Sequence, residues 1–370
     1  MKINLSNQDL VEVQALSDQK SLNMEAADLY NDFLNNHYDS IDERVINDQF
    51  IEREQSDSEA FYSAFLKILD LDPNDQELKK LEKNNQFNIV KELDPKSFLE
   101  NPYIKHIHVP DFPLGKWEYE MNRYNPYESF VFDETQVDDK NNYSEKTQLG
   151  FFPKEVSYLN LLENNEVWMS ITPHEINTMA KPISNAKGKV LMFGLGLGYF
   201  SYMVANKPDV KSVTIIEKSE SAIKLFEKAI LPQFEHKEKI RIIKDDAFGY
   251  AKNKMANEQY DYSFFDIYHS PEEGLEDYLK MKKLEILNNK TTYDYWIEES
   301  ILCLFRRYVL TLIEEQLDGL TEKDYVVVQN NDDKMMQRLF NCLNDYSLNS
   351  FADVKDLLSD SSLKKLALKA

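Results

Sequence analysis

Three alternating glycines after a short apolar run constrain the fold of this 370-residue chain more than any other feature. The apolar run covers residues 190–193, the glycines are Gly194, Gly196 and Gly198, and aromatic residues resume at Tyr199. Glycine has no Cβ, so it allows positive φ and lets a ligand approach the backbone of a turn. The pattern predicts a strand, a tight turn and a helix start, although such a turn can also serve packing alone.

Each of the next three predicted strands ends in an acidic residue, in the order that an open parallel α/β sheet requires. Ligands bind such sheets at the carboxyl ends of the strands, so these acids are candidates for binding roles. A single acid there can equally be a helix cap or a loop charge, but an ordered set makes coincidence a poorer explanation. The strands and acids are 212–216 with Glu217, 240–244 with Asp246, and 260–265 with Asp266.

The spacing of the glycines separates two kinds of nucleotide-binding turn. A dinucleotide fingerprint needs a glycine at position 199, where this chain has Tyr199. The compact Gly194-x-Gly196-x-Gly198 form resembles motif I of class I S-adenosylmethionine-dependent methyltransferases and of the related aminopropyltransferases. The resemblance covers roughly residues 155–330. It implies an α/β fold with a Rossmann-like methyltransferase sheet, and S-adenosylmethionine or S-adenosylhomocysteine rather than NAD as the ligand.

The same resemblance gives roles to the residues at the ends of the strands. The three glycines form the cofactor turn, and Glu217 accepts hydrogen bonds from both ribose hydroxyls. The Asp246 carboxylate takes the exocyclic amine of adenine, and the Ala247 N–H faces a ring nitrogen.

One branch of the superfamily matches the segment before the glycine turn. Residues 168–176 and the loop that begins at Asp266 resemble guanidino N-methyltransferases. In that branch acids hold a guanidinium, which makes Asp266 the main candidate and Glu175 the second, with Trp168 in the substrate site. Met169 stands where that family has a glutamate. This branch implies methyl transfer to a small cationic amine or guanidine.

A second branch is the spermidine synthases, which approach the glycine turn through a hairpin similar to residues 161–171. These aminopropyltransferases carry two spaced aspartates after the fourth strand, whereas this chain has Asp266 followed by His269. A third reading is a non-catalytic sensor or scaffold that keeps the nucleoside pocket. The sequence leaves all three readings open.

Either transfer is an in-line displacement at a carbon bonded to a sulfonium, for which the protein positions a neutral nitrogen and stabilises developing charge. Asp266 can hold the cationic substrate and assist its deprotonation, and His269 or Tyr268 can carry the proton. Tyr268 and His269 are equally well explained as packing residues of the loop.

The chain divides into four predicted parts. Residues 1–100 are helical and carry no catalytic pattern, which indicates packing or formation of a homo-oligomer, with covering of the substrate as the alternative. Residues 101–180 form a β-rich lead-in, 181–330 an S-adenosylmethionine-binding domain, and 331–370 a helical C-terminal extension.

Local patterns add further predictions within these parts. Residues 104–109 predict a strand, the polar stretch 133–146 predicts a mobile loop or lid, and 156–171 predicts a hairpin. After Asp266 the chain is predicted to be helical until a fifth strand at 325–328.

The net charge of −22 argues against a role on nucleic acid, because phosphate contacts need a basic surface. The same charge attracts cationic small molecules, although many proteins are acidic for solubility alone. No apolar run has the length of a membrane span, and the amino terminus lacks an export signal. Cys303 and Cys342 lack metal-ligand spacing, and His106 and His108 lack a third ligand, so we expect a reduced, cytoplasmic protein without a metal.

Overall fold

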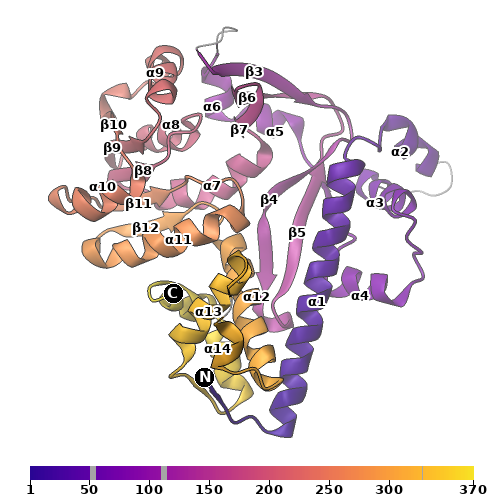
Figure 1. Cartoon of the computed structure of the whole chain (residues 1–370). Helices are drawn as coiled ribbons and strands as arrows, with labels where there is room; N and C mark the ends of the chain where they lie inside the picture. Colours follow the sequence, from indigo (N-terminus) through magenta and orange to yellow (C-terminus); the bar gives the residue numbers. More distant parts are fainter. Residues whose placement is uncertain (51–55, 110–114, 327) are drawn as a thin grey trace.

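A five-stranded parallel sheet organises the part of the chain that carries the glycine motif (left side of Figure 1). The computed structural model describes residues 1–50, 56–109, 115–326 and 328–370. The strand order is β10-β9-β8-β11-β12, so the strand before the glycines is central. These strands are β8 (Gly188–Phe193), β9 (Val210–Glu217), β10 (Ile240–Lys244), β11 (Tyr262–Phe265) and β12 (Thr292–Tyr295).

The order of the strands opens a crevice at one edge of this sheet. From β8 the chain builds outward through β9 and β10, then returns to the other side of β8 for β11 and β12. The connections that follow β8 and β11 therefore leave in opposite directions, and a crevice forms at the carboxyl ends of these two strands. The α/β arrangement is compatible with a Rossmann-like fold.

Continuous apolar sequence explains why β8 is central. Residues 190–193 are at most 2% exposed, as expected for a parallel strand that is covered on both faces. The strands predicted at 212–216, 240–244 and 260–265 are confirmed as β9, β10 and β11. The helices around the sheet are α7 (Pro173–Asn185), α8 (Tyr199–Ala205), α9 (Glu220–Ala229), α10 (Ala247–Asn253) and α11 (Pro271–Glu285), with 3-10 turns η2 (Leu231–Gln233), η3 (Lys237–Lys239), η4 (Met255–Asn257) and η5 (Ile286–Asn288).

The predicted position of the fifth strand is wrong. That strand is β12, which pairs in parallel with β11, and its last residue Tyr295 is buried. In the predicted segment, Val326 is 65% exposed, Val328 lies outside any strand, and Val327 lies outside the described residues. The helical prediction for the residues of β12 failed because a four-residue run of threonine, tyrosine and aspartate is too short to show a period. The segment before Val326 is a 3-10 turn, η6 (Glu322–Tyr325).

The strand predicted at 104–109 is also wrong, because these residues begin in a short helix, α6 (Pro102–His106). Asn101 caps this helix by accepting a hydrogen bond from the Tyr103 N–H (2.9 Å), and proline occupies the first helical position. His106 lies in the helix and His108 beyond it, so they do not share a strand face.

The loop or lid predicted at 133–146 is a β-hairpin. Its polar side chains contact a neighbouring helix: Glu134 accepts a hydrogen bond from the Ser300 N–H (2.9 Å), and Glu145 forms an ion pair with Arg307. The polar sequence therefore reflects specific partners rather than mobility. The hairpin consists of β4 (Ser129–Asp138), the 3-10 turn η1 (Asp139–Asn141) and β5 (Ser144–Phe151), and β2 (Val90–Glu92) extends its sheet.

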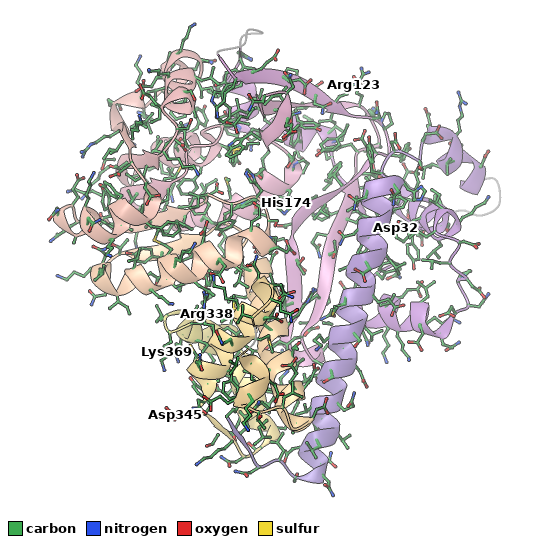
Figure 2. The ribbon with its side chains drawn as sticks, viewed as in Figure 1. Asp32, Arg123, His174, Arg338, Asp345 and Lys369 are labelled. Atoms are coloured by element: carbon green, nitrogen blue, oxygen red, sulfur yellow. The ribbon has the colours of Figure 1, made fainter. Side chains whose placement is uncertain are left out.

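The hairpin predicted at 156–171 is confirmed, and it leads directly into the five-stranded sheet. Its two strands pair in antiparallel fashion, and a third strand completes a small sheet in the order β3-β6-β7. Helix α7 follows this hairpin and packs against β4; Figure 2 labels His174 near the start of α7. The strands are β3 (Trp117–Tyr124), β6 (Val156–Glu163) and β7 (Glu166–Ser170).

Helix α1 (Asn7–Asn36) runs beside the β4–β5 hairpin, with α2, α3 and α4 on its other side, and contacts α4, β5, α12 and α14 (Figure 1). The first strand, β1, pairs in parallel with β13, so the first and last segments of the chain lie together. In the described residues, no helix combines the length and apolar character needed to cross a bilayer. The remaining elements are β1 (Lys2–Ile3), α2 (Glu43–Phe50), α3 (Asp57–Ile68), α4 (Gln76–Asn85), α5 (Pro95–Leu99), α12 (Glu298–Leu317), α13 (Asn331–Leu343), β13 (Ser347–Leu348), α14 (Phe351–Leu357) and α15 (Asp360–Ala367).

Candidate functional site

A cavity lies at the carboxyl ends of β8, β9, β10 and β11, where the strand order opens the sheet. Its walls come from the glycine turn, the ends of β9 and β10, the segment after β11, and β7 of the lead-in hairpin. All site residues predicted from the sequence line it, except Gly198 and Glu175. Those that do are Trp168, Gly194, Gly196, Glu217, Asp246, Ala247, Asp266, Tyr268 and His269.

The glycine turn fits closely against two neighbours. At Gly194 (φ 93°) a Cβ would lie 1.8 Å from the carbonyl oxygen of Asp266. At Gly196 (φ 52°) a Cβ would lie 2.3 Å from the Sδ of Met169. Neither position can take a side chain without movement of its neighbour. Gly198 instead caps the start of α8 and packs against Phe226, outside the cavity.

Glu217 is held in one orientation at the end of β9 by two backbone amides. Its Oε2 accepts a hydrogen bond from the Leu195 N–H (3.2 Å), and its Oε1 accepts one from the Ser219 N–H (2.7 Å). Each carboxylate oxygen can accept more than one hydrogen bond. The side chain can therefore still accept hydrogen bonds from a pair of hydroxyls in the cavity.

Asp246 and Ala247 begin α10 beyond the end of β10. Asp246 Oδ1 accepts a hydrogen bond from the Gly249 N–H (2.7 Å), so this carboxylate is a helix cap as well as part of the cavity wall. The Ala247 N–H belongs to the first turn of the helix, where no preceding carbonyl accepts it. This end of the cavity thus offers an acceptor and a donor side by side.

Asp266, directly after β11, is 6% exposed and lines the cavity. Its backbone N–H donates to the Phe193 carbonyl oxygen (3.0 Å), which fixes the residue beside the glycine turn. Within the described part of the chain, no hydrogen bond or ion pair engages its carboxyl group. Burial raises the pKa of Asp266 to about 7.

Glu175, in the first turn of α7, does not line the cavity but lies close enough to Asp266 to sense its charge. Burial raises the pKa of Glu175 well above its ordinary value, and the negative charge of Asp266 raises it further. Two acids from distant parts of the chain therefore form a pair that is costly to ionise without a cation. Binding a cation near them would lower the pKa of both groups.

The two residues proposed as proton carriers lie in different environments. Tyr268 is buried, and its hydroxyl donates to the Trp296 carbonyl oxygen (2.7 Å), so its proton already has a partner. His269 is exposed, and its ring packs edge-on against Trp168 with centroids 4.7 Å apart. Of the two, His269 is the better placed to exchange a proton with solvent.

Met169 is a contributor to the site that the sequence reading did not select. It lies in β7, and its Sδ accepts a hydrogen bond from the Leu197 N–H (3.2 Å) above Gly196. Asp277, in α11, also lines the cavity. Neither residue follows a strand of the sheet, so no local pattern identifies it. Asp245 was missed as well, although it directly precedes Asp246.

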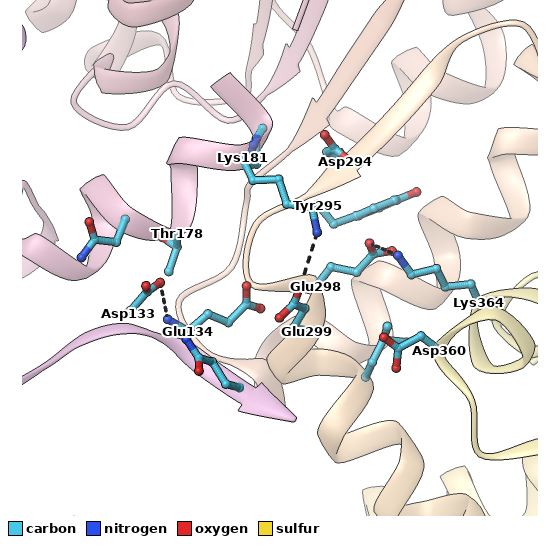
Figure 3. A pocket seen from close by; sticks show the side chains of 14 residues that line it. Asp133, Glu134, Thr178, Lys181, Asp294, Tyr295, Glu298, Glu299, Asp360 and Lys364 are labelled. Atoms are coloured by element: carbon cyan, nitrogen blue, oxygen red, sulfur yellow. Dashed lines mark hydrogen bonds and ion pairs between the residues drawn. The ribbon is translucent and has the colours of Figure 1, made fainter. Parts of the chain in front are cut away.

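A second cavity lies between β4, α7, β12, α12 and α15 (Figure 3). Acidic side chains gather in it, but two of its glutamates already have cationic partners: Lys181 lies 3.4 Å from Glu299, and Lys364 lies 2.6 Å from Glu298. This cavity contains none of the sequence-predicted site residues and is away from the glycine turn. The cavity at the strand ends is therefore the better candidate.

The described residues contain no group of three His, Cys, Asp or Glu side chains that could hold a metal ion. Comparison with known proteins finds no protein-family model that matches the chain and no similar curated protein.

Proposed function

We propose that this protein is an S-adenosylmethionine-dependent transferase that acts on a small cationic amine or guanidine. The observation that carries the proposal is the buried carboxyl group of Asp266, which has no hydrogen-bond or ion-pair partner among the described residues and shares a cavity with Glu217. A nucleoside site needs hydroxyl acceptors and groups that bind a base, whereas transfer to an amine needs an acid near the reacting carbon. The groups suited to a nucleoside and the acid suited to amine transfer both occur at the carboxyl edge of the sheet, where open α/β sheets bind their ligands.

In this proposal the nucleoside lies across the ends of β9 and β10. Glu217 accepts hydrogen bonds from the ribose hydroxyls, because its orientation is fixed by two amides. Asp246 and the Ala247 N–H contact the exocyclic amine and a ring nitrogen of adenine. Gly194 and Gly196 let the ligand approach the turn.

The acceptor lies on the β11 side of the glycine turn. Asp266 holds the charged acceptor with one nitrogen close to the sulfonium carbon, and Glu175, outside the cavity lining, adds only to the attraction for a cation. The lone pair of the deprotonated nitrogen forms the new N–C bond, and the electron pair of the broken C–S bond stays on sulfur, which becomes a neutral thioether. The proton that frees this lone pair passes to Asp266 before the attack, and the alkylated nitrogen of the product carries the positive charge that was on sulfur. A carboxyl group with a pKa of about 7 can take up and release that proton near neutral pH.

Aminopropyl transfer is the second candidate, and the charge of the cavity favours it. Among the described residues that line the cavity, Lys218 is the only lysine or arginine. S-adenosylmethionine carries a sulfonium, an ammonium and a carboxylate, whereas its decarboxylated form lacks the carboxylate; the decarboxylated form is therefore more positive and suits acidic walls better.

Calorimetry with adenosyl ligands and NAD tests the proposed binding. We expect S-adenosylmethionine or its close analogues to bind more tightly than NAD, because Tyr199 replaces the third dinucleotide glycine and is buried. NAD affinity that equals or exceeds the adenosyl affinities would overturn the proposal. A mass-spectrometric screen of amines and guanidines then tests transfer. Binding without turnover of any of them would favour a non-catalytic sensor.

Replacing Glu217 by alanine should weaken nucleoside binding by about 1–3 kcal/mol, through the loss of charge-assisted hydrogen bonds to ribose. Titration calorimetry of the two proteins measures the change. Glu220→Ala is the matched control, because Glu220 follows β9 by three residues but pairs with Lys224 and Lys244 outside the cavity. Equal affinities of wild type and Glu217→Ala would remove Glu217 from the binding site.

A further inference from the structure

The sheet order determines which part of an adenosyl sulfonium meets which wall of the cavity. This step rests on the proposed function. With ribose and adenine on the β9 and β10 side, the substituents on sulfur extend across the glycine turn toward β11. That region is bounded by Gly196, Met169 and Asp266. The tail of the cofactor, which carries a carboxylate only in S-adenosylmethionine, therefore lies beside Met169.

Backbone amides of a glycine turn would be the natural donors for a carboxylate tail, but several here are already engaged. The Leu197 N–H donates to the Sδ of Met169 (3.2 Å), and the Leu195 N–H donates to Glu217 (3.2 Å). The Gly198 N–H donates to the Leu195 carbonyl oxygen (3.0 Å). The carboxylate of an S-adenosylmethionine tail would have to displace the Met169 side chain before it could accept a hydrogen bond from the Leu197 amide.

The side chains around the tail do not replace those donors. Lys218 is the only lysine or arginine among the described residues of the cavity wall, and it lies beyond the end of β9, on the ribose side. Asp266 lies on the tail side, and its charge has no cationic partner among the described residues. A carboxylate there would oppose ionisation of the buried Asp266 side chain, whereas an ammonium would favour the ionised side chain and meet it as an acceptor.

We propose that Met169 is a specificity-determining residue, which makes the cavity select an adenosyl sulfonium with a neutral or cationic tail over one with a carboxylate. Its thioether occupies the Leu197 N–H, a turn donor that would otherwise face the carboxylate of the tail, and its bulk rests on Gly196. Because only the decarboxylated cofactor has a cationic tail without a carboxylate, this selection favours aminopropyl transfer over methyl transfer.

Titration calorimetry with three ligands tests the selection in wild type and in Met169→Ala. The ligands are 5′-methylthioadenosine, which has no charged tail, S-adenosylmethionine, and decarboxylated S-adenosylmethionine. In wild type we expect the decarboxylated cofactor to bind about tenfold more tightly than S-adenosylmethionine. In Met169→Ala the freed Leu197 amide should reduce this ratio by a factor of about three or more. Met121→Ala, at an exposed methionine of β3, should leave the ratio unchanged.

The three ligands separate failure of this inference from failure of the proposed function. If methylthioadenosine does not bind, the adenosyl site itself is wrong. If it binds but wild type does not prefer the decarboxylated cofactor, or Met169→Ala keeps the full preference, the role of Met169 is wrong. Should Met169→Ala fail to fold, Met169→Val carries the test, because valine suits a strand but removes both the sulfur that accepts the Leu197 N–H and the length that covers Gly196. An unchanged ratio in that folded variant would also overturn the role of Met169.

Discussion

Replacing Asp266 by asparagine is expected to abolish transfer while leaving the affinity for 5′-methylthioadenosine, which has no charged tail, unchanged. Asparagine keeps the shape of the side chain but removes the charge that attracts the acceptor and the base that takes its proton. The loss of a positioned base typically lowers the rate about 10²–10⁴-fold. Single-turnover kinetics on a substrate found in the screen, together with calorimetry of the nucleoside, separate the two effects.

The matched control for Asp266→Asn is Glu272→Gln. Glu272 is exposed in the first turn of α11, a few residues after Asp266, and it does not line the cavity. The Glu272→Gln variant should therefore turn over substrate at the wild-type rate. If Asp266→Asn also turns over normally, Asp266 is a structural residue of the loop, and the assignment of the acceptor site fails.

Because the pKa of Asp266 is raised by folding, Asp266→Asn should also change how the stability of the protein depends on pH. The ordinary pKa of 3.8 applies to the unfolded chain, whereas burial raises the pKa to about 7 in the folded chain. Between these values the folded protein keeps a proton that the unfolded protein has lost, so this group lowers stability as pH rises from about 4 to about 7. Asp266→Asn lacks that decline. Its Tm relative to wild type should therefore increase across this range and level off above it.

The five-stranded sheet was largely predictable because its signals are local. A continuous apolar run before Gly194 and acids at the ends of the following strands mark a buried parallel sheet, and its carboxyl edge contains most of the predicted site. β12 was missed because it is four residues long and is held mainly by pairing with β11. The hairpin structure of residues 133–146 was missed because polar residues there, such as Glu145, have partners far away in the sequence.

The candidate site likewise contains residues that local sequence signals identify and residues that only long-range contacts bring in. Glu217, Asp246 and Asp266 follow strands, so their position could be inferred from the order of elements. Met169 reaches the glycine turn from a separate small sheet, and no pattern within β7 indicates that its sulfur accepts the Leu197 N–H. The sequence could indicate where the candidate site lies but not which backbone amides of the glycine turn are already engaged by other groups.

Helix α1 links parts of the fold that the sequence presents as separate. Buried Asn23 accepts hydrogen bonds at Oδ1 from Gln19 Nε2 (2.8 Å), Asn85 Nδ2 (2.8 Å) and the Glu145 N–H (3.0 Å). Its Nδ2 donates to the Tyr143 carbonyl oxygen (2.9 Å). One amide side chain therefore ties α1 to α4 and to the β4–β5 hairpin. Gln19 Nε2 and Asn85 Nδ2 each keep another acceptor, but removing the Asn23 amide takes away the partner of two groups buried from water, the Glu145 N–H and the Tyr143 carbonyl oxygen.

Asn23→Ala should accordingly lower the free energy of unfolding by about 3 kcal/mol or more, since each buried group left unsatisfied adds a desolvation cost. Asn36→Ala is the control on the same helix: Asn36 is exposed, bonds only to Asp32, and should change stability by less than about 0.5 kcal/mol. Denaturant unfolding followed by circular dichroism measures both changes. If Asn23→Ala lowers the free energy of unfolding as little as Asn36→Ala does, the buried hydrogen bonds of Asn23 do not contribute to stability as expected.

The shape of the Asn23→Ala transition also decides how the helical first part of the chain relates to the candidate site. Val13 and Leu16 of α1 pack in the same apolar cluster as the five-stranded sheet, whereas Tyr30 and Phe33 pack with α3 and α4. Because α1 contributes residues to both apolar clusters, unfolding of either cluster should also unfold the other. We therefore expect a single transition, with methylthioadenosine binding lost at the same denaturant concentration as the helical signal. An early transition that leaves the nucleoside bound would instead identify residues 1–100 as an independent folding unit, and the proposed transfer site would then not depend on α1.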